Sequence, residues 1–302
     1  MRPRGIEAVR QHLARLPATS TLSFDELRAQ YDKAEHAFPL ASDVEVTNVM
    51  MRGVPGQWLR SSGSEAAIVL YFHGGGYVIG SPRSHRHLAA AIARASGGSA
   101  LLPDYRRAPE HRFPAAVDDA VAAYRWLIDD HGAHPGSVVI AGDSAGGGLM
   151  LATLLALRDA GVPLPAAGVG ISPWTDLSCS QPSHTARAAA DPIVDASTLQ
   201  RMAAAYLGTA DPRTPLASPL LGDLRELPAL LIHVGSDEVL LDDATAFVAR
   251  AHAAGVDATL EVWDHMVHVW HWFLPMLDEA QAAVDRIGAF VRMRTGATVR
   301  AR

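Results

Sequence analysis

The sequence predicts an α/β fold in which a mostly parallel central sheet is flanked by helices. Short, continuous apolar segments alternate with amphipathic segments of helical length along most of the 302 residues. Strands that are apolar on both faces are typical of parallel sheets, because the connecting helices cover the sheet on either side. With 49% hydrophobic residues the chain can bury a large core, so we expect a single domain over residues 1–302.

The elements follow from this pattern in chain order. The first forty residues have helical patterning of mixed polarity, including a segment at 24–34. Segments 44–49 and 57–61 predict two strands joined by a hairpin at the Gly-Val-Pro-Gly stretch 53–56. The buried strands expected after them are 67–72, 99–103, 137–141, 167–171, 229–234 and 259–262. The helices expected between and after these strands are 85–95, 115–128, 146–159, 242–254 and 279–292.

The composition excludes several classes of protein. A net charge of −6 gives no reason to expect a nucleic-acid partner, since phosphate binding needs clustered Lys and Arg. Cys179 is the only cysteine, which excludes an intrachain disulfide and a cysteine-based zinc site. Residues 1–20 have no apolar run of signal-peptide length, and the longest apolar stretch, 149–157, is too short to cross a bilayer. We therefore expect a cytoplasmic protein without stable membrane insertion.

A G-x-S-x-G motif occupies residues 142–146, directly after the predicted strand 137–141 and at the start of the predicted helix 146–159. In this strand–turn–helix context the motif is typical of a nucleophile turn. The tight turn strains the backbone of the serine, and the flanking glycines remove Cβ atoms that would collide. The pattern predicts that Ser144 is an exposed nucleophile at a helix N-terminus, whose dipole favours developing negative charge.

Three consecutive glycines follow His73 at the end of the predicted strand 67–72. Their backbone N–H groups could approach a ligand closely. Together with the amide of Ala145, the amides of Gly75 and Gly76 could form an oxyanion hole. We expect His73 to brace this loop through hydrogen bonds and not to act as a catalytic base.

A nucleophilic serine needs a base, and the base needs a carboxylate that orients it. In proteins whose nucleophilic serine lies in such a strand–turn–helix motif, the acid follows a late strand and the histidine follows the last strand. The predicted strand 229–234 leads into an acidic stretch at 235–243, and the strand 259–262 leads into histidines 265, 268 and 271. Three such histidines could suggest a metal site, but no H-E-x-x-H pattern is present, so we expect no metal and no cofactor.

Taken together, these motifs resemble those of the bacterial hormone-sensitive lipase family, also called family IV esterases, in the α/β-hydrolase superfamily. The resemblance runs from about residue 71 to 273. It rests on H-G-G-G-Y at 73–77, D-Y-R-R-A-P-E-H-R-F-P-A-A at 104–116, G-D-S-A-G-G at 142–147 and S-P-W at 172–174. Arg107 stands where the family usually has leucine. The resemblance implies an α/β-hydrolase fold with a helical cap.

The resemblance also implies the two remaining members of a catalytic triad. The family carries its acid in a pattern like D-P-L-x-D-D/E, which places Glu238 at the acid position, with Asp237 as the alternative. It carries its base in H-G-F, which favours His268 over His265, although Val-Trp replaces Gly-Phe at 269–270. A glutamate is chemically adequate to hold the imidazole in the required tautomer.

The implied cap comprises residues from 1 to about 40 and from about 181 to 208. Asp191 and Met202 fall in its second segment, where they either line the acyl pocket or pack the cap. The implied activity is hydrolysis of short- to medium-chain acyl esters, small-molecule substrates, through an acyl-enzyme on Ser144. The alternatives are an amidase or deacetylase with the same triad, or a non-catalytic ligand receptor on the same fold. The resemblance is also compatible with a homodimer.

Overall fold

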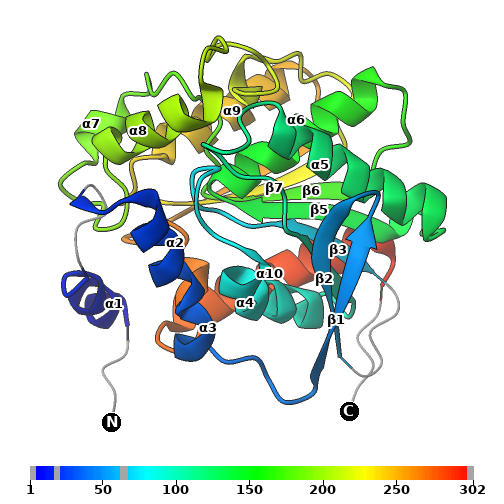
Figure 1. The fold of residues 1–302 in the computed structure, drawn as a ribbon, viewed down its shortest axis with the longest axis horizontal. Helices are drawn as coiled ribbons and strands as arrows, with labels where there is room; N and C mark the ends of the chain where they lie inside the picture. The colour runs from blue at the N-terminus through cyan, green and yellow to red at the C-terminus, as the bar shows by residue number, and fades with distance from the viewer. Residues whose placement is uncertain (1–4, 17–20, 62–66, 298–302) are drawn as a thin grey trace.

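The eight strands form one sheet, which the computed structural model describes together with the rest of residues 5–16, 21–61 and 67–297 (Figure 1). The strand order is β1-β2-β4-β3-β5-β6-β7-β8. β1 pairs antiparallel with β2, and β2 antiparallel with β4, whereas every other neighbouring pair is parallel. The predicted mostly parallel sheet is therefore confirmed. The strands are β1 Val44–Met51, β2 Val54–Ser61, β3 Ile68–Phe72, β4 Ser99–Pro103, β5 Val138–Asp143, β6 Ala167–Ile171, β7 Ala229–Gly235 and β8 Ala258–Trp263.

The turn between β1 and β2 differs from the prediction. Met51 pairs with Val54, so the turn consists of only Arg52 and Gly53, and the rest of the expected turn 53–56 belongs to β2. Arg52 and Gly53 have φ angles of 50° and 92°. Two successive residues with positive φ are typical of a type I′ turn, whose twist matches that of the flanking strands. The prediction of a four-residue turn was wrong, because the last three of the four residues, at 54–56, pair with β1 as part of β2.

Helices cover both faces of the sheet (Figure 1). α4 (Pro82–Ala95) and α10 (Asp278–Thr295) pack on one face, where their apolar side chains share a core with β3, β4 and β5. α5 (Ala115–Arg125), α6 (Ala145–Asp159) and α9 (Leu241–Ala253) pack on the other. The α-helical geometry of α5 ends three residues before the predicted limit, and the chain continues as a π-helical turn over Trp126–Asp130.

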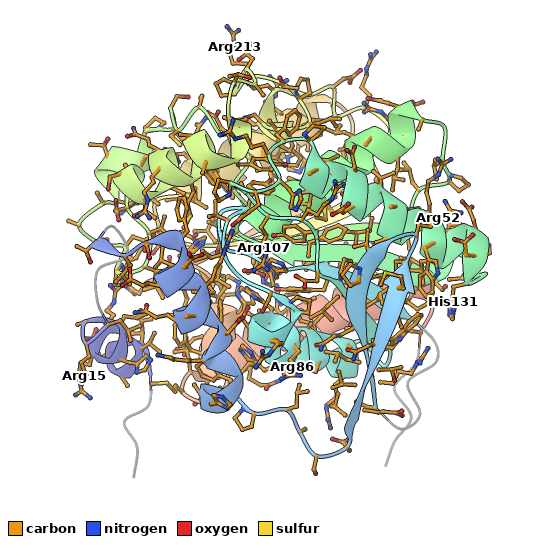
Figure 2. The ribbon with its side chains drawn as sticks, in the orientation of Figure 1. Arg15, Arg52, Arg86, Arg107, His131 and Arg213 are labelled. Carbon is orange, nitrogen blue, oxygen red and sulfur yellow. The ribbon has the colours of Figure 1, made fainter. Side chains whose placement is uncertain are left out.

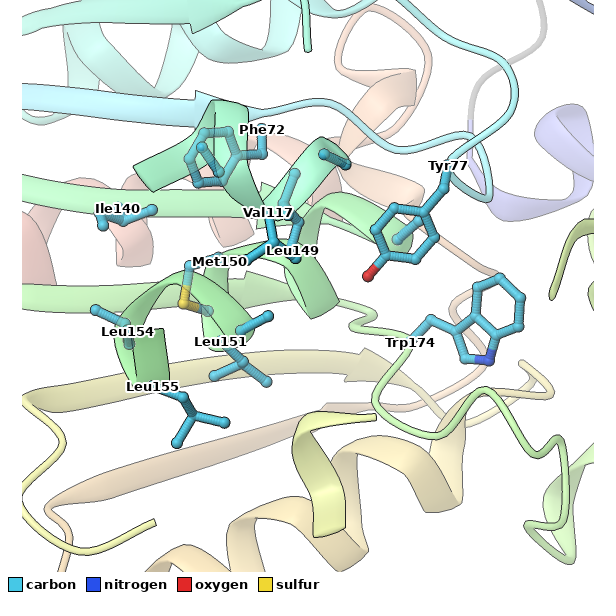
Figure 3. Packing of buried hydrophobic residues seen from close by; sticks show 14 of the residues in the cluster. Phe72, Tyr77, Val117, Ile140, Leu149, Met150, Leu151, Leu154, Leu155 and Trp174 are labelled. Atoms are coloured by element: carbon cyan, nitrogen blue, oxygen red, sulfur yellow. The ribbon is translucent and has the colours of Figure 1, made fainter. Parts of the chain in front are cut away.

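α6 is the central helix of the second face. It is apolar on nearly all sides, and leucines at positions 149, 151, 154 and 155 are buried together with Met150 (Figure 3). A helix that is apolar all round is typical of a buried position. Because α6 is enclosed by the sheet and by α5, the residue at its N-terminus is fixed relative to the carboxyl ends of the strands.

The two segments expected to form a cap contain short helices near that end of the sheet (Figure 1). The first has α1 (Ile6–Leu13), α2 (Phe24–Asp32) and α3 (Ala34–Ala37), and the second has α7 (Ser183–Ala186) and α8 (Ala196–Leu207). The segments contact each other, because Arg201 of α8 donates to Leu22 O at 2.7 Å and lies 4.3 Å above the ring of Phe24. Residues 1–4 and 17–20 of the first segment lie outside the described residues.

None of the described helices has both the length and the apolarity to span a membrane.

Arg28 fastens α2 to the main body of the protein. Its guanidinium donates to Val78 O and to Ala108 O, each at 2.8 Å, and pairs with the carboxylate of Glu110 at 2.7 Å. Val78 and Ala108 are fully buried. Because buried carbonyl oxygens need donors, one side chain here satisfies two backbone groups that water cannot reach.

Replacing Arg28 by Met is expected to lower the free energy of unfolding by about 1–3 kcal/mol, because two buried carbonyls lose their donors. Chemical denaturation of the variant and the unaltered protein measures this difference. Arg52→Met is the matched control, since Arg52 pairs with Asp129 and Asp130 at the surface (Figure 2). Exposed ion pairs contribute little, so the control should unfold almost as the unaltered protein does. Equal losses in the two variants would contradict this account of Arg28.

Candidate active site

Ser144 lies between the last residue of β5 and the first residue of α6. Its backbone has φ 53° and ψ −121°, a strained combination for a residue with a Cβ atom. Its N–H donates to Ile171 O at 2.8 Å, and its carbonyl accepts from Trp174 N at 2.9 Å. These bonds to the last residue of β6 and to the chain just after it hold the strained turn, and Ser144 remains partly exposed.

The turn around Ser144 is too tight for side chains at the two glycines of the motif. A Cβ atom on Gly142 would lie 2.2 Å from the carbonyl oxygen of Gly146. A Cβ atom on Gly146 would lie 2.1 Å from Phe72 O. Glycine at both positions therefore lets the start of α6 approach β5 and the end of β3.

Asp143 connects this turn to the glycine loop that follows β3. Its Oδ1 accepts from Gly74 N at 3.1 Å and from the hydroxyl of Tyr71 at 2.7 Å. His85 Nε2 lies 3.4 Å from Oδ2. Burial disfavours the charged carboxylate, but the neighbouring His85, Tyr71 and His73 outweigh it and lower the pKa of Asp143. The loop is thus tied to the residue that precedes Ser144.

His73 braces the loop, as expected. Its ring stacks on Tyr105 with centroids 4.2 Å apart, and its Nδ1 lies 2.8 Å from Gly74 O. The hydroxyl of Tyr105 donates to His73 O at 2.7 Å. Burial lowers the pKa of His73 well below its ordinary value, so its imidazole is neutral at physiological pH.

The candidate oxyanion donors lie on two neighbouring elements. Gly75 and Gly76 have φ angles of 116° and 60°, and Ala145 is the first residue of α6. A Cβ atom on Gly76 would lie 2.1 Å from Met202 Sδ. Met202 of α8 therefore packs directly on the glycine loop, at 7% exposure.

Glu238 is fully buried in the loop between β7 and α9. Its Oε2 lies 2.7 Å from His268 Nδ1, whereas its Oε1 accepts from Gly235 N at 2.5 Å and from Ser172 Oγ at 2.8 Å. The neighbouring Asp237 points elsewhere and pairs with Arg10 at 2.7 Å. The structure therefore brings Glu238, and not Asp237, to the imidazole.

His268 lies in the loop after β8 and is 5% exposed. Burial lowers the pKa of its imidazole, but the hydrogen bond and charge of Glu238 outweigh burial, and the charges of Asp191 and Asp143 add to them. The net result is a pKa of His268 above its ordinary value. These anions favour the protonated imidazole, which is the form that a general base reaches when it accepts a proton.

The two other histidines of this stretch lie apart from Glu238. His265 is exposed, with φ 63°. His271 is buried with its Nε2 3.0 Å from His233 Nδ1, and burial lowers the pKa of both rings. Within the described ranges, no group of three or more His, Cys, Asp or Glu side chains is arranged to hold a metal ion.

Ser172 is a member of the site to which the sequence pattern assigned no role. Its hydroxyl donates to Glu238 Oε1 and accepts from Val269 N at 3.2 Å, so it joins the carboxylate of Glu238 to the residue after His268. One signal was available in the sequence. Ser172 directly follows β6, and ligands of parallel sheets bind at the carboxyl ends of the strands.

A surface hollow of about 450 Å³ lies elsewhere, between the β1–β2 hairpin and the start of α4. Its lining includes Met50, Gln57, Ser81 and Asp104 and none of the residues at 144, 238 and 268. The sequence motifs lie instead at the carboxyl ends of the strands, so this hollow is not the candidate substrate site.

Comparison with known proteins agrees with the expected α/β-hydrolase fold. A family model for the alpha/beta hydrolase fold matches residues 69–272. An acetyl-hydrolase of Streptomyces hygroscopicus is 51% identical over 269 residues, covering 89% of this chain and 90% of that protein. A crystal structure of an esterase of the bacterial hormone-sensitive lipase family is 49% identical, with a TM-score of 0.91 and coverage of 95% and 96%. The crystal structure of EstE5 soaked with p-nitrophenyl butyrate is 48% identical, with a TM-score of 0.92 and coverage of 97% and 99%.

The geometry predicts which of the two adjacent carboxylates, Glu238 or Asp237, raises the pKa of His268. Glu238→Gln removes the charge beside Nδ1, so the pKa of His268 should fall. Asp237→Asn is the matched control and should leave that pKa unchanged, because Asp237 faces Arg10. NMR titration of the histidine ring measures both. A fall in the Asp237 variant without one in the Glu238 variant would reverse the assignment.

Proposed function

The chain belongs to the alpha/beta hydrolase fold family, among the esterases of the bacterial hormone-sensitive lipase family, and from this premise we propose a serine carboxylesterase that forms an acyl-enzyme on Ser144. That it is a carboxylic ester hydrolase follows from its relatives. The observation that carries the mechanism is the 2.7 Å contact between buried Glu238 and His268, at the same sheet edge as the strained serine.

In the first step the oxygen of Ser144 attacks the ester carbonyl, and His268 Nε2 accepts the serine proton. Glu238 accepts a hydrogen bond from Nδ1–H, which keeps the unprotonated Nε2 available to the serine. Its charge also stabilises the imidazolium that forms. The ester C–O bond then breaks, and His268 gives the proton to the departing alcohol.

The amides of Gly75, Gly76 and Ala145 are the proposed donors to the oxyanion of the tetrahedral intermediate. Two features support this. The glycine loop is tied to the serine turn through Asp143, and Ala145 starts a helix whose N-terminal dipole favours negative charge. Each such donor stabilises the transition state by about 3 kcal/mol. In the second step water, activated by His268, hydrolyses the acyl-enzyme.

We propose that segments 1–40 and 181–208 form the cap of a single hydrolase domain and that the cap restricts the acyl chain. Met202 packs on Gly76, so it reduces the space beside the proposed oxyanion hole. The relative named acetyl-hydrolase and the EstE5 crystals soaked with a butyrate ester support a preference for short acyl groups. The homodimer and the cytoplasmic location stay predictions from the sequence.

Ser144→Ala is expected to lower kcat by a factor of about 10³ to 10⁶, because the nucleophile is removed while the binding groups remain. The measurement is hydrolysis of p-nitrophenyl butyrate, together with labelling by an organophosphonate and mapping of the modified residue. Ser197→Ala, at an exposed serine of α8, is the control and should keep both activity and labelling. Normal turnover by the Ser144 variant would refute the proposed mechanism.

Met202→Ala is expected to raise kcat/KM for an octanoate ester relative to an acetate ester by at least about tenfold. The substitution removes side-chain atoms beside Gly76, and each methylene accommodated in an apolar pocket contributes about 1 kcal/mol. A series of p-nitrophenyl esters from acetate to decanoate measures the change. Gln200→Ala, on the exposed side of the same helix, should leave the series unaltered. An unchanged series in the Met202 variant contradicts the restriction.

A further inference from the structure

Asp191 is a buried carboxylate in the second cap segment that the proposed mechanism does not use. It is 9% exposed. Its Oδ1 accepts from Ile193 N at 2.9 Å and from Val194 N at 3.0 Å, and its Oδ2 accepts from Val239 N at 2.9 Å. Three N–H donors divided between both oxygens favour the ionised carboxylate, since a protonated one would need an acceptor for its own proton.

Val239 is the residue that immediately follows Glu238, and it is fully buried. The cap holds its peptide groups on both sides, because Asp191 accepts from Val239 N and the hydroxyl of Ser183 donates to Val239 O at 2.5 Å. Ser183 N also donates to Asp242 Oδ2 at 2.8 Å. The loop that carries Glu238 is thus attached to the cap through its backbone.

Asp191 also lies close enough to the site to act on His268, because its Oδ2 accepts from the residue next to Glu238, and its charge raises the pKa of the imidazole. Burial and the charge of Glu238 raise the pKa of Asp191 above its ordinary value, although the attraction of His268 and the N–H donors of Val194 and Val239 oppose that rise. Three carboxylates act on His268 from different elements: Glu238 from the loop after β7, Asp191 from the cap and Asp143 from the end of β5. Of these, Glu238 is hydrogen-bonded to the imidazole ring, whereas Asp143 accepts hydrogen bonds from Gly74 N and from the hydroxyl of Tyr71.

We propose that Asp191 is a positioning residue that fastens the cap to the acid loop and provides a second buried anion for the His268 imidazolium. The proposal rests on the triad proposed above. When His268 accepts the serine proton, a positive charge appears on a ring that is only 5% exposed, where water screens it little, so a nearby fixed anion lowers the barrier. The same contact makes the position of Glu238 depend on a docked cap.

The test is the pH profile of kcat/KM for p-nitrophenyl butyrate in Asp191→Asn. The acidic limb reports the pKa of the free enzyme's base. Removal of an anion lowers the pKa of His268, so the limb should move to lower pH, while kcat on the plateau falls about tenfold as the acid loop loses its anchor. A residue with a merely structural role would lower the plateau without moving the limb.

Asp195→Asn is the matched control, because Asp195 lies in the same segment but caps α8 through Thr198 N at 2.9 Å. It should keep the limb of the unaltered enzyme. If Asp191→Asn does not fold, Asp191→Ser removes the charge and retains a small acceptor. An acidic limb that superimposes on that of the unaltered enzyme, or one that moves equally in the Asp195 variant, overturns the proposal. Inactivity of Ser144→Ala alongside such a result would leave the proposed function standing, so the two failures are distinguishable.

Discussion

The site depends on the burial of one carboxylate, that of Glu238. A fully buried charge is costly unless it is paired and hydrogen-bonded. Gly235 N, Ser172 Oγ and His268 Nδ1 meet this requirement, and they come from the ends of β7 and β6 and the loop after β8. The carboxylate is therefore stable only when these three segments are in register at the carboxyl edge of the sheet. The geometry of the site and the stability of that edge are consequently linked.

A second constraint is the packing of the glycine loop between the sheet and α8. From the sheet side, Asp143 holds Gly74 beside the serine turn. From the side of α8, Met202 packs on Gly76, and the ring of Tyr206 stacks on Tyr77 with centroids 4.0 Å apart. Met202 and Tyr206 lie four residues apart on α8, so one face of that helix covers the loop. α8 therefore helps to shape the loop as well as to cover it.

The sequence by itself determined the order and type of the main elements, because apolar periodicity reflects which faces are buried. The strands after β2 start and end within two residues of the predicted limits. The two-residue turn at Arg52 and the π-helical end of α5 were not predicted. Many residue types can adopt either backbone conformation, so no residue at these positions indicates it in advance. The role of the glycines around Ser144 could be predicted from the sequence, because a strained turn in which two segments approach closely admits few other residues.

Only the tertiary structure decided which of two adjacent carboxylates lies beside His268. Asp237 and Glu238 are neighbours in sequence and chemically alike, and the family pattern alone favoured Glu238 without excluding Asp237. Their surroundings come from distant parts of the chain: Arg10 accompanies Asp237, whereas Ser172 and His268 accompany Glu238. The contact of Asp191 with Val239 spans 48 positions in the same way. Sequence periodicity specifies local conformation, but the partners of a buried charge are set by packing between segments that are remote in the chain.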